Sequence, residues 1–248
     1  MDGEVTLHVA AGVATLTLDR PAKHNAITNA MAEQLSELAR QINADESIRA
    51  VLLRGGGERA FCAGMDLRAI EAFASAWDFR HRPDYPGAVR SIRKPVVAAL
   101  RGWALGGGFE LALAADIRIA AESTRIGFPE VTRGWVGGGG ASQMLPRLIG
   151  YGQAMRLLLT GEQVDAAEAL RLRLVEQVVA EAELLPTAEA LCARLAALSP
   201  VAVQAVKAAV RHSLEAPFSA GLAYENEMNV LCLASLREGA ALREQARA

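Results

Sequence analysis

The chain has 248 residues, of which 52% are hydrophobic and 22% charged, and its formal net charge is −2. This length and composition suffice for one sizeable buried core with a modest appendage, rather than for several independent domains. The low net charge and the scattered arginines exclude the basic stripe of a nucleic-acid-binding protein, so a small-molecule function is favoured.

The cysteines, the histidines and the N-terminus exclude further classes. Cys62, Cys192 and Cys232 are far apart and without C-x-x-C spacing, which argues against a disulfide framework or a zinc site, and the four histidines are isolated from one another. Met1–Ala10 carries acidic residues instead of an apolar signal core, and no apolar run approaches ~18 residues. We therefore expect no metal, no membrane span and a cytoplasmic location.

The first fifth of the chain predicts two strands, a helix and a third strand. Val5–Val9 and Val13–Leu18 alternate in polarity as half-buried strands do. Residues 28–43 carry apolar side chains on one helical face, namely Met31, Leu35, Leu38 and Ile42. Ala50–Arg54 is a short apolar run, typical of a buried strand.

A loop of small residues follows the third strand. The segment Ala60–Leu67 contains Ala63 and Gly64, which let a ligand approach the backbone closely, and the N–H of Met65 is a candidate hydrogen-bond donor. Over residues 66–93 the pattern weakens, and aromatic residues, arginines and prolines are crowded together. We predict a mobile or variable wall of a pocket there.

The most informative residue is Glu110, a carboxylate inside an apolar stretch that opens with three glycines. Residues 102–115 otherwise read as buried core, where an ionised side chain costs several kcal/mol unless it is compensated. The N–H groups of Gly106–Gly108 lie at the positive end of a predicted helix, which favours negative charge. If the N–H groups of Gly107 and Met65 both face one oxygen, they form an oxyanion hole, worth ~3–4 kcal/mol per donor in other enzymes.

A second carboxylate, Glu130, follows in the run Gly127–Glu130. Two acids kept from water can hold different protonation states and divide general acid and base work. Each glutamate also has a structural interpretation as an alternative to catalysis. Glu110 would then be a carboxylate that is hydrogen-bonded to backbone N–H groups or to an arginine, and Glu130 would cap a helix. Val96–Leu100 and Ile117–Ala120 add further predicted strands, and this alternation of strands with helices predicts an α/β fold.

The last quarter of the chain is predicted to be helical. Ser199 supplies a capping hydroxyl before Pro200, the residue favoured at the first helical position. The predicted helices span residues 187–198, 200–213, 219–235 and 238–247. We divide the chain into an α/β core with the active site (1–186) and a helical oligomerisation region (187–248).

Several blocks together resemble the crotonase superfamily, the family of enoyl-CoA hydratases and isomerases. In chain order they are Leu18–Pro21 with Asn25–Ala26, Ala60–Leu67, Lys94–Ala99, Gly102–Asp116, Gly127–Gly150 and Leu159–Gly161. The resemblance covers nearly the whole chain. It implies a spiral of ββα units with a helical C-terminal part used for trimerisation, and an assembly that is a homotrimer or a dimer of trimers.

The resemblance also implies an acyl-CoA thioester as substrate, with coenzyme A as part of that substrate and no separate cofactor. The thioester oxygen would be held by the N–H groups of Met65 and Gly107. Members with both glutamates are typically hydratases, so Glu110 would activate the water that attacks C3, and Glu130 would deliver a proton to C2. The chain is therefore predicted to be an enoyl-CoA hydratase-like lyase that adds water to the 2,3-double bond, or removes it.

Six further residues are candidates for binding the substrate: Lys23, Ala63, Asp66, Arg68, Trp135 and Gly138. Lys23 and Arg68 would meet the phosphates of coenzyme A, and solvated surface charge is an equally good reading. Asp66 also reads as a structural carboxylate that accepts hydrogen bonds from loop N–H groups, and Gly138 as part of a tight turn.

The sequence leaves the acyl group open. An acyl pocket has three candidate aromatic residues, Trp77, Phe79 and Trp135, and a polar acyl tail has three candidate partners, Arg80, Arg82 and Arg133, but no pattern fixes their directions. Two other functions are alternatives. One is an enoyl-CoA isomerase in which Glu130 alone moves a proton, and the other is a non-catalytic acyl-CoA-binding relative.

Overall fold

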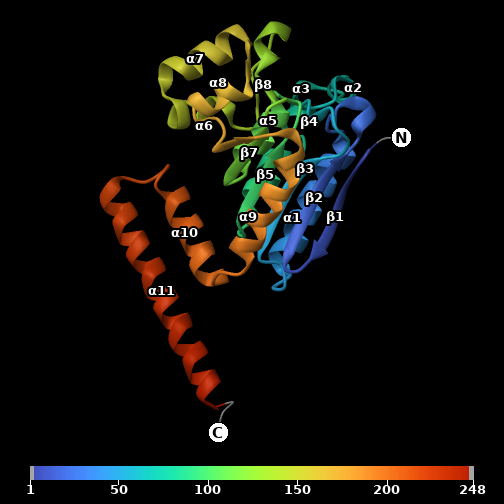
Figure 1. The fold of residues 1–248 in the computed structure, drawn as a ribbon. Helices are drawn as coiled ribbons and strands as arrows, with labels where there is room; N and C mark the ends of the chain where they lie inside the picture. The colour runs from blue at the N-terminus through green and yellow to red at the C-terminus, as the bar shows by residue number, and fades with distance from the viewer. Residues whose placement is uncertain (1–2, 246–248) are drawn as a thin grey trace.

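The computed structural model describes residues 3–245, of which residues 240–245 are described by their backbone alone. Within this range the strands form two sheets (Figure 1). The large sheet has the order β1 (Glu4–Ala10), β2 (Val13–Asp19), β3 (Ala50–Gly55), β5 (Val96–Leu100), β7 (Ile117–Ala121) and β10 (Gln177–Val179). The small sheet has the order β4 (Ala60–Cys62), β6 (Trp103–Leu105), β8 (Arg125–Gly127) and β9 (Gln163–Asp165).

Three successive pairs of strands each contribute one strand to the large sheet and one to the small sheet. In the pairs β3 and β4, β5 and β6, and β7 and β8, the first strand joins the large sheet and the second joins the small sheet. In the large sheet β2, β3, β5 and β7 pair in parallel, and in the small sheet β4, β6 and β8 do so. The pairing of β1 with β2 and that of β8 with β9 are antiparallel. The predicted α/β class and the spiral of strand pairs with helices are confirmed.

The helices lie between and around these strands. They are α1 (Asn29–Ala44), α2 (Leu67–Glu71), α3 (Ala76–Arg80), α4 (Tyr85–Arg90), α5 (Gly107–Ala114), α6 (Ala141–Ile149), α7 (Tyr151–Thr160), α8 (Ala166–Arg171), α9 (Leu184–Ala196), α10 (Pro200–His212) and α11 (Phe218–Gln245). Short 3-10 helices span Pro21–Lys23, Pro129–Arg133 and Glu181–Glu183. The predicted start of α1 is confirmed, since the hydroxyl of Thr28 accepts the N–H of Met31.

The central strands β3, β5 and β7 of the large sheet are buried on both faces, to which successive side chains point in turn. Val51 and Leu53 of β3 join the core cluster that contains the apolar face of α1. Ala50 and Leu52 join a second cluster, to which α9 contributes Leu184, Ala188 and Cys192. The helix α9, most of which lies beyond the predicted division at residue 186, thus packs directly on the sheet.

The helices α10 and α11 form a hairpin that projects away from the two sheets, and we call this hairpin the arm (Figure 1). The cap predicted from Ser199 and Pro200 is confirmed, because the Ser199 hydroxyl accepts the N–H of Ala202. The predicted break between residues 235 and 238 is wrong: α11 runs without interruption from Phe218 to Gln245. Residues 1, 2 and 246–248, which the predicted ranges include, lie outside the described residues.

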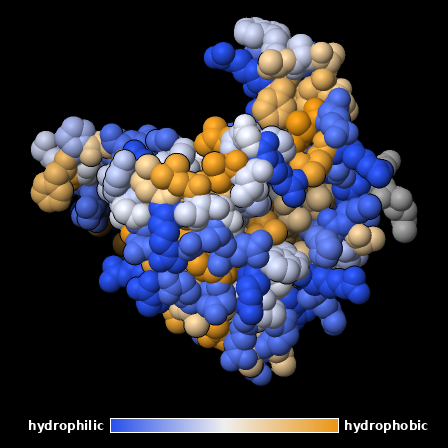
Figure 2. All heavy atoms as spheres, turned by 90° about the horizontal axis from the view of Figure 1, so that it is seen from above, coloured by the Kyte–Doolittle hydropathy of each residue, from blue (hydrophilic) through white to orange (hydrophobic). Residues whose placement is uncertain are grey.

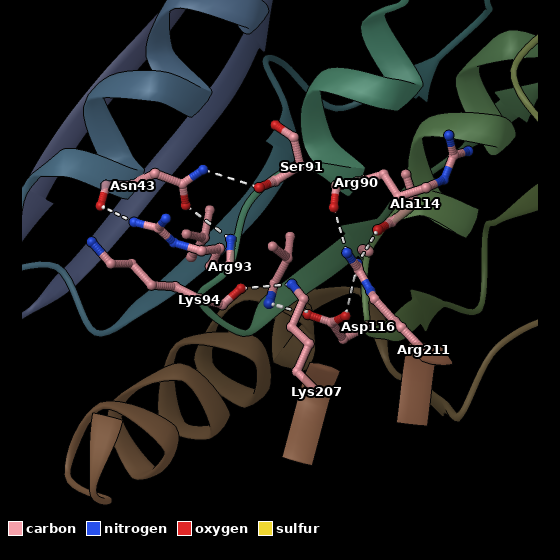
Figure 3. A network of polar contacts seen from close by, with 12 residues as sticks. Asn43, Arg90, Ser91, Arg93, Lys94, Ala114, Asp116, Lys207 and Arg211 are labelled. Carbon is pink, nitrogen blue, oxygen red and sulfur yellow. Dashed lines mark hydrogen bonds and ion pairs between the residues drawn. The ribbon is translucent and has the colours of Figure 1, made fainter. Parts of the chain in front are cut away.

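One carboxylate fastens the arm to the body, as Figure 3 shows. The two oxygens of Asp116 lie 2.6 Å from Lys207 Nζ and 3.0 Å from Arg211 Nη2. Lys207 also donates a hydrogen bond of 2.7 Å to the carbonyl of Lys94. Burial lowers the pKa of Lys207 to about 8, although the nearby Asp116 opposes this shift.

Apolar side chains also reach the surface. Seen from above, the molecule carries apolar patches between hydrophilic regions (Figure 2). Among the described residues, no single helix is long and apolar enough to cross a membrane. The pair Glu181–Ala196 and Pro200–His212, bent by 108°, meets that test by length and composition alone.

Candidate active site

The turn from β6 into α5 buries Glu110. Gly106 has φ of +52°, a conformation open to glycine, and α5 begins directly after it. From Gly108 onward every residue of α5 is buried, and Glu110 is only 2% exposed. Its Oε1 accepts the N–H of Ala141, the first residue of α6, at 3.0 Å. The positive end of α6 therefore compensates part of the cost of burying this carboxylate.

Glu130 lies on the 3-10 helix Pro129–Arg133, directly after β8. Burial raises the pKa of its carboxyl group above the ordinary value, and the charge of Glu110 raises it further, while Arg133 acts in the opposite direction. Glu130 consequently holds a proton to higher pH than a free glutamate does.

The loop of Gly137, Gly138 and Gly139 covers both carboxylates. A Cβ atom at residue 137 would lie 2.8 Å from Glu110 Oε1 and 3.5 Å from Glu130 Oε1, and a Cβ at residue 139 would lie 2.6 Å from Glu110 Oε2. Two oxygens that belong to different glutamates thus lie near one point of space. The carboxylates are close enough to act on adjacent atoms of one small molecule, and side chains on the loop would displace them.

Two backbone N–H groups meet beside the glutamates. Ile27 donates to the carbonyl of Gly64 at 2.8 Å and accepts the N–H of Asp66 at 2.9 Å, an arrangement that does not use the N–H of Met65. Gly64 packs against Gly107, since a Cβ at residue 64 would lie 3.3 Å from the Gly107 nitrogen. Within the part of the chain that the structure describes, neither the Met65 nor the Gly107 N–H has a backbone acceptor.

Asn25 holds the loop that carries Met65. Its side chain is fully buried, and its amide nitrogen donates to the carbonyls of Gly56, Ala60 and Phe61 at 2.9, 2.8 and 3.2 Å. Its amide oxygen accepts the N–H of Arg20 at 3.0 Å. The sequence analysis assigned no role to the side chain of Asn25. The one signal that could have pointed to it is that a polar amide stands in the short block Asn25–Ala26.

Asp66 fixes the same loop from the other side. Its carboxylate pairs with Arg20 and accepts the N–H of Arg68 at 3.0 Å, which caps α2. Burial alone would raise the pKa of Asp66, but the hydrogen bonds from Arg20 and from the Arg68 N–H outweigh it and hold the pKa below its ordinary value. These contacts favour the structural reading of Asp66.

All ten predicted site residues line one cavity of about 920 Å³. They are Lys23, Ala63, Met65, Asp66, Arg68, Gly107, Glu110, Glu130, Trp135 and Gly138. The region predicted as a variable wall, residues 66–93, contributes α2, α3 and α4 to the same cavity. Phe79 lines it as well, whereas Trp77 is 66% exposed and stacks on His81, so the acyl-pocket role considered for Trp77 is wrong.

Tyr85 is a cavity residue that sequence reasoning did not single out. It is buried, and its hydroxyl stands over Gly107, since a Cβ at residue 107 would lie 1.9 Å from Tyr85 Oη. Burial raises the pKa of this hydroxyl well above its usual value, and the neighbouring Cys62, Glu110 and Glu130 add to the rise. Tyr85 therefore presents a neutral hydrogen-bond donor next to the paired amides.

Cys62 lies beside the cavity but is unsuited to nucleophilic chemistry. Its thiol is buried and donates to the carbonyl of Asn25, and burial raises its pKa to about 12. Among the described residues, no three His, Cys, Asp or Glu side chains are grouped so that they could hold a metal ion. The groups of this cavity that lie closest to Gly107 and its loop are the carboxylates of Glu110 and Glu130 and the phenol of Tyr85.

Comparison with known proteins gives one consistent result. A family model described as enoyl-CoA hydratase/isomerase matches residues 8–242. A Bacillus subtilis protein named as an enoyl-CoA hydratase/isomerase is 40% identical over 220 residues, which are 87% of this chain and 84% of that protein. The (E)-benzylidenesuccinyl-CoA hydratase of Thauera aromatica is 36% identical over 226 residues, which are 90% of this chain and 88% of that enzyme.

A solved structure agrees with these sequence matches. The crystal structure of an enoyl-CoA hydratase from Bacillus anthracis superposes with a TM-score of 0.87 at 34% identity, and the match covers 97% of this chain and 96% of that one.

Proposed function

The chain belongs to the enoyl-CoA hydratase/isomerase family, and we propose that it is a hydratase-type lyase that adds water to the 2,3-double bond of an enoyl-CoA thioester, or catalyses the reverse dehydration. The observation that carries this proposal is the pair of carboxylates, Glu110 and Glu130, that face one point of the cavity, beside the amides of Met65 and Gly107, which have no backbone acceptor among the described residues.

The first step of the proposed reaction is the binding of the thioester carbonyl. Its oxygen accepts the N–H groups of Met65 and Gly107, which are fixed in place by the loop contacts of Asn25 and by the start of α5. Negative charge develops on this oxygen when water adds to C3. Preorganised amides stabilise that charge because they need no reorientation during the reaction, and each is worth about 3–4 kcal/mol in other enzymes.

The two glutamates handle the water and the protons. Glu110, as the base, takes one proton from the water molecule while the water oxygen forms its bond to C3 and the C2–C3 double bond becomes the enolate. Glu130, whose pKa is raised by burial so that its protonated form is favoured over that of a free glutamate, donates its proton to C2 as the thioester carbonyl reforms. A proton then returns from Glu110 to Glu130 through solvent, which restores the starting state.

The remaining cavity residues divide into a coenzyme A side and an acyl side. We assign Lys23 and Arg68, which line the cavity near the amide loop, to the phosphates of coenzyme A. Ala63 lets the thioester approach that loop. Gly138 and Trp135 belong to the acyl side, together with the loop over the glutamates. Since one relative is named for benzylidenesuccinyl-CoA, family membership does not fix the acyl group.

We also propose that the arm assembles the protein as a homotrimer or a dimer of trimers. The arm extends beyond the core and exposes large apolar side chains, among them Val206 on α10 and Phe218 on α11, which is 82% exposed. Such side chains are commonly covered by another protein surface.

The test is a panel of enoyl-CoA substrates with short, long, branched, cyclic and aromatic acyl groups, in water enriched in oxygen-18. A hydratase incorporates solvent oxygen into its product, whereas an isomerase only moves the double bond. For at least one panel member we expect turnover that falls by at least about a hundredfold in Glu110→Gln.

Glu122→Gln is the matched control, because Glu122 is an exposed carboxylate outside the cavity. Undiminished turnover in Glu110→Gln would refute the hydratase mechanism, and a product without solvent oxygen would show an isomerase instead. Tight binding of acyl-CoA with no conversion of any panel member would show a non-catalytic protein.

A further inference from the structure

Arg82 lies in the connection between α3 and α4, and the structure fixes the direction of its side chain. Its Nη1 donates a hydrogen bond of 3.0 Å to the carbonyl of Phe79. Its guanidinium carbon lies 4.1 Å from the centre of the Phe79 ring, so the planar group stacks on the aromatic face. Two independent contacts with one neighbour therefore hold the guanidinium in a single orientation.

Arg82 lines the cavity and packs against the glycine loop that covers the glutamates. A Cβ atom at Gly138 would lie 2.1 Å from Arg82 Nη2, so the arginine rests directly on the glycine loop. The neighbours of Gly138 in that loop are Gly137 and Gly139, which cover the two glutamates. Arg82 therefore contacts the glycine that stands between the two glycines covering the glutamates, and consecutive Cα atoms are only about 3.8 Å apart.

Arg82 carries its positive charge in the lining of the cavity. Within the described part of the chain it forms no ion pair. The acidic side chains of the cavity have other contacts: Asp66 pairs with Arg20, Asp84 accepts the N–H of Gly87, Glu110 accepts the N–H of Ala141, and Glu130 feels the charge of Arg133. Because this half-buried guanidinium lines the cavity and is not neutralised by an ion pair within the described residues, it attracts an anionic group that is bound there.

We propose that Arg82 binds a carboxylate at the far end of the acyl group, so that the substrates are CoA monothioesters of short unsaturated dicarboxylic acids. A carboxylate matches the planar fork of a guanidinium, and a charged pair of this kind discriminates strongly against a neutral acyl tail. This inference rests on the proposed function, because it places C2 and C3 of the acyl group at Glu110 and Glu130. Arg82 is then a specificity-determining residue and takes no part in bond making.

The experiment compares two substrates that differ in charge but hardly in shape. Glutaconyl-CoA carries a carboxylate two carbons beyond its double bond, and 5-methylhex-2-enoyl-CoA has an isopropyl group in the same place. We expect the wild type to prefer glutaconyl-CoA in kcat/KM. In Arg82→Met this preference should fall about 10- to 100-fold, while kcat/KM for the neutral substrate changes less than about threefold.

Arg80→Met is the matched control, because Arg80 also lines the cavity but is exposed, and its guanidinium lies over Trp77 instead of against the glycine loop. It should leave the preference unchanged. Arg133→Gln tests the other arginine near the glutamates. If the preference is absent in the wild type, or is lost in Arg80→Met or Arg133→Gln instead of Arg82→Met, the assignment is wrong.

A binding measurement separates this inference from the proposed reaction. Calorimetric titration with glutaryl-CoA and with 5-methylhexanoyl-CoA, both saturated, requires no chemistry. Tighter binding of glutaryl-CoA that is lost in Arg82→Met supports the inference even if no hydration is found. Equal weakening of both ligands and of free coenzyme A in Arg82→Met would overturn it, because Arg82 would then hold the coenzyme instead of the acyl tail.

Discussion

Glu110 and Glu130 lie near each other in the cavity, but their neighbours give them different environments. Glu110 is almost fully buried and accepts a backbone N–H at the start of α6. Glu130 is less buried, and its pKa is raised by burial and by the charge of Glu110. Environments that separate the protonation behaviour of two acids assign the base and acid roles. The raised pKa of Glu130 supports our proposal that Glu130 donates the proton and that Glu110 acts as the base.

The raised pKa of Glu130 predicts a pH-dependent effect on stability. The folded state favours the protonated carboxyl, so the contribution of Glu130 to stability is fully present below the ordinary value of 4.5 and is lost as pH rises through the raised pKa. Glu130→Gln should therefore have a higher Tm than the wild type at pH 8, and this difference should shrink toward pH 4. Thermal unfolding followed by circular dichroism across that range measures it.

The same variant should lose activity by about 10²- to 10⁴-fold, the usual value of a general acid. Glu122→Gln, at an exposed position, should show neither effect. A stability gain in Glu130→Gln that is independent of pH would contradict the assignment of a raised pKa.

At the scale of elements, the segment between β3 and α2, which includes β4, is held in place by the buried side-chain amide of Asn25. Asn25 joins three carbonyls of this loop, and it also adopts a positive φ of 55°. The loop carries the Met65 N–H, so the position of one half of the paired amides is set by a side chain from a distant part of the sequence. The side chain of Asn25 thus determines where a backbone N–H group of the proposed reaction lies.

Asn25→Ala should destabilise the protein by about 2–4 kcal/mol, because it leaves buried carbonyls without donors and places alanine in a left-handed conformation. Urea unfolding measures this loss. The turnover of the folded fraction should also fall, since the Met65 N–H loses its support.

Asn43→Ala is the control for this prediction. Asn43 likewise holds neighbouring backbone groups, those of Ser91 and Arg93, but it lies outside the cavity (Figure 3). It should lower stability without lowering turnover per folded molecule. Equal loss of turnover in both variants would show that the Asn25 contacts have no particular bearing on the site.

The sequence predicted the elements that are long or strongly periodic. The strands β1, β2, β3, β5 and β7 and the helix α1 were found because alternation and helical spacing persist over several residues. The small sheet was not found, because its strands have only three residues each, too few for any period. The false break in α11 fell near Gly239, a residue that weakens a helix by about 1 kcal/mol without ending it.

For the whole molecule, the main question is what covers the arm. Val206 and Val210 of α10 are both more than half exposed, four residues apart on one helical face. Phe218 and Leu222 of α11 repeat that spacing. An isolated chain would leave this apolar surface in water, so self-association through the arm is the expected state.

Replacing both Phe218 and Leu222 by Glu should convert the assembly to monomers, because charges on both positions oppose burial against another subunit. Sedimentation velocity measures the mass in solution. Ala220→Glu adds a charge on the opposite side of α11, at another exposed residue, and should leave the assembly intact. An unchanged mass of the double variant would show that the arm does not hold the subunits together.

The sequence predicted which residues belong to the candidate site better than it predicted how those residues contact one another. Every predicted site residue lines the one cavity, because the glycine blocks mark the turns where strands give way to helices. Asn25, Tyr85 and the direction of Arg82 could not be predicted, since each depends on contacts between segments far apart in the chain. Spacing within a motif carries no information about such contacts.

The spiral arrangement separates what must stay constant in this protein from what is free to diverge. The amides and the acids sit where the paired strands end, whereas α2 and α3 bury no residue in the core. Evolution can therefore rewrite residues 67–83, including Phe79 and Arg82, while the machinery around the thioester is inherited unchanged. New acyl preferences within such a lineage would arise chiefly by exchange of this one segment.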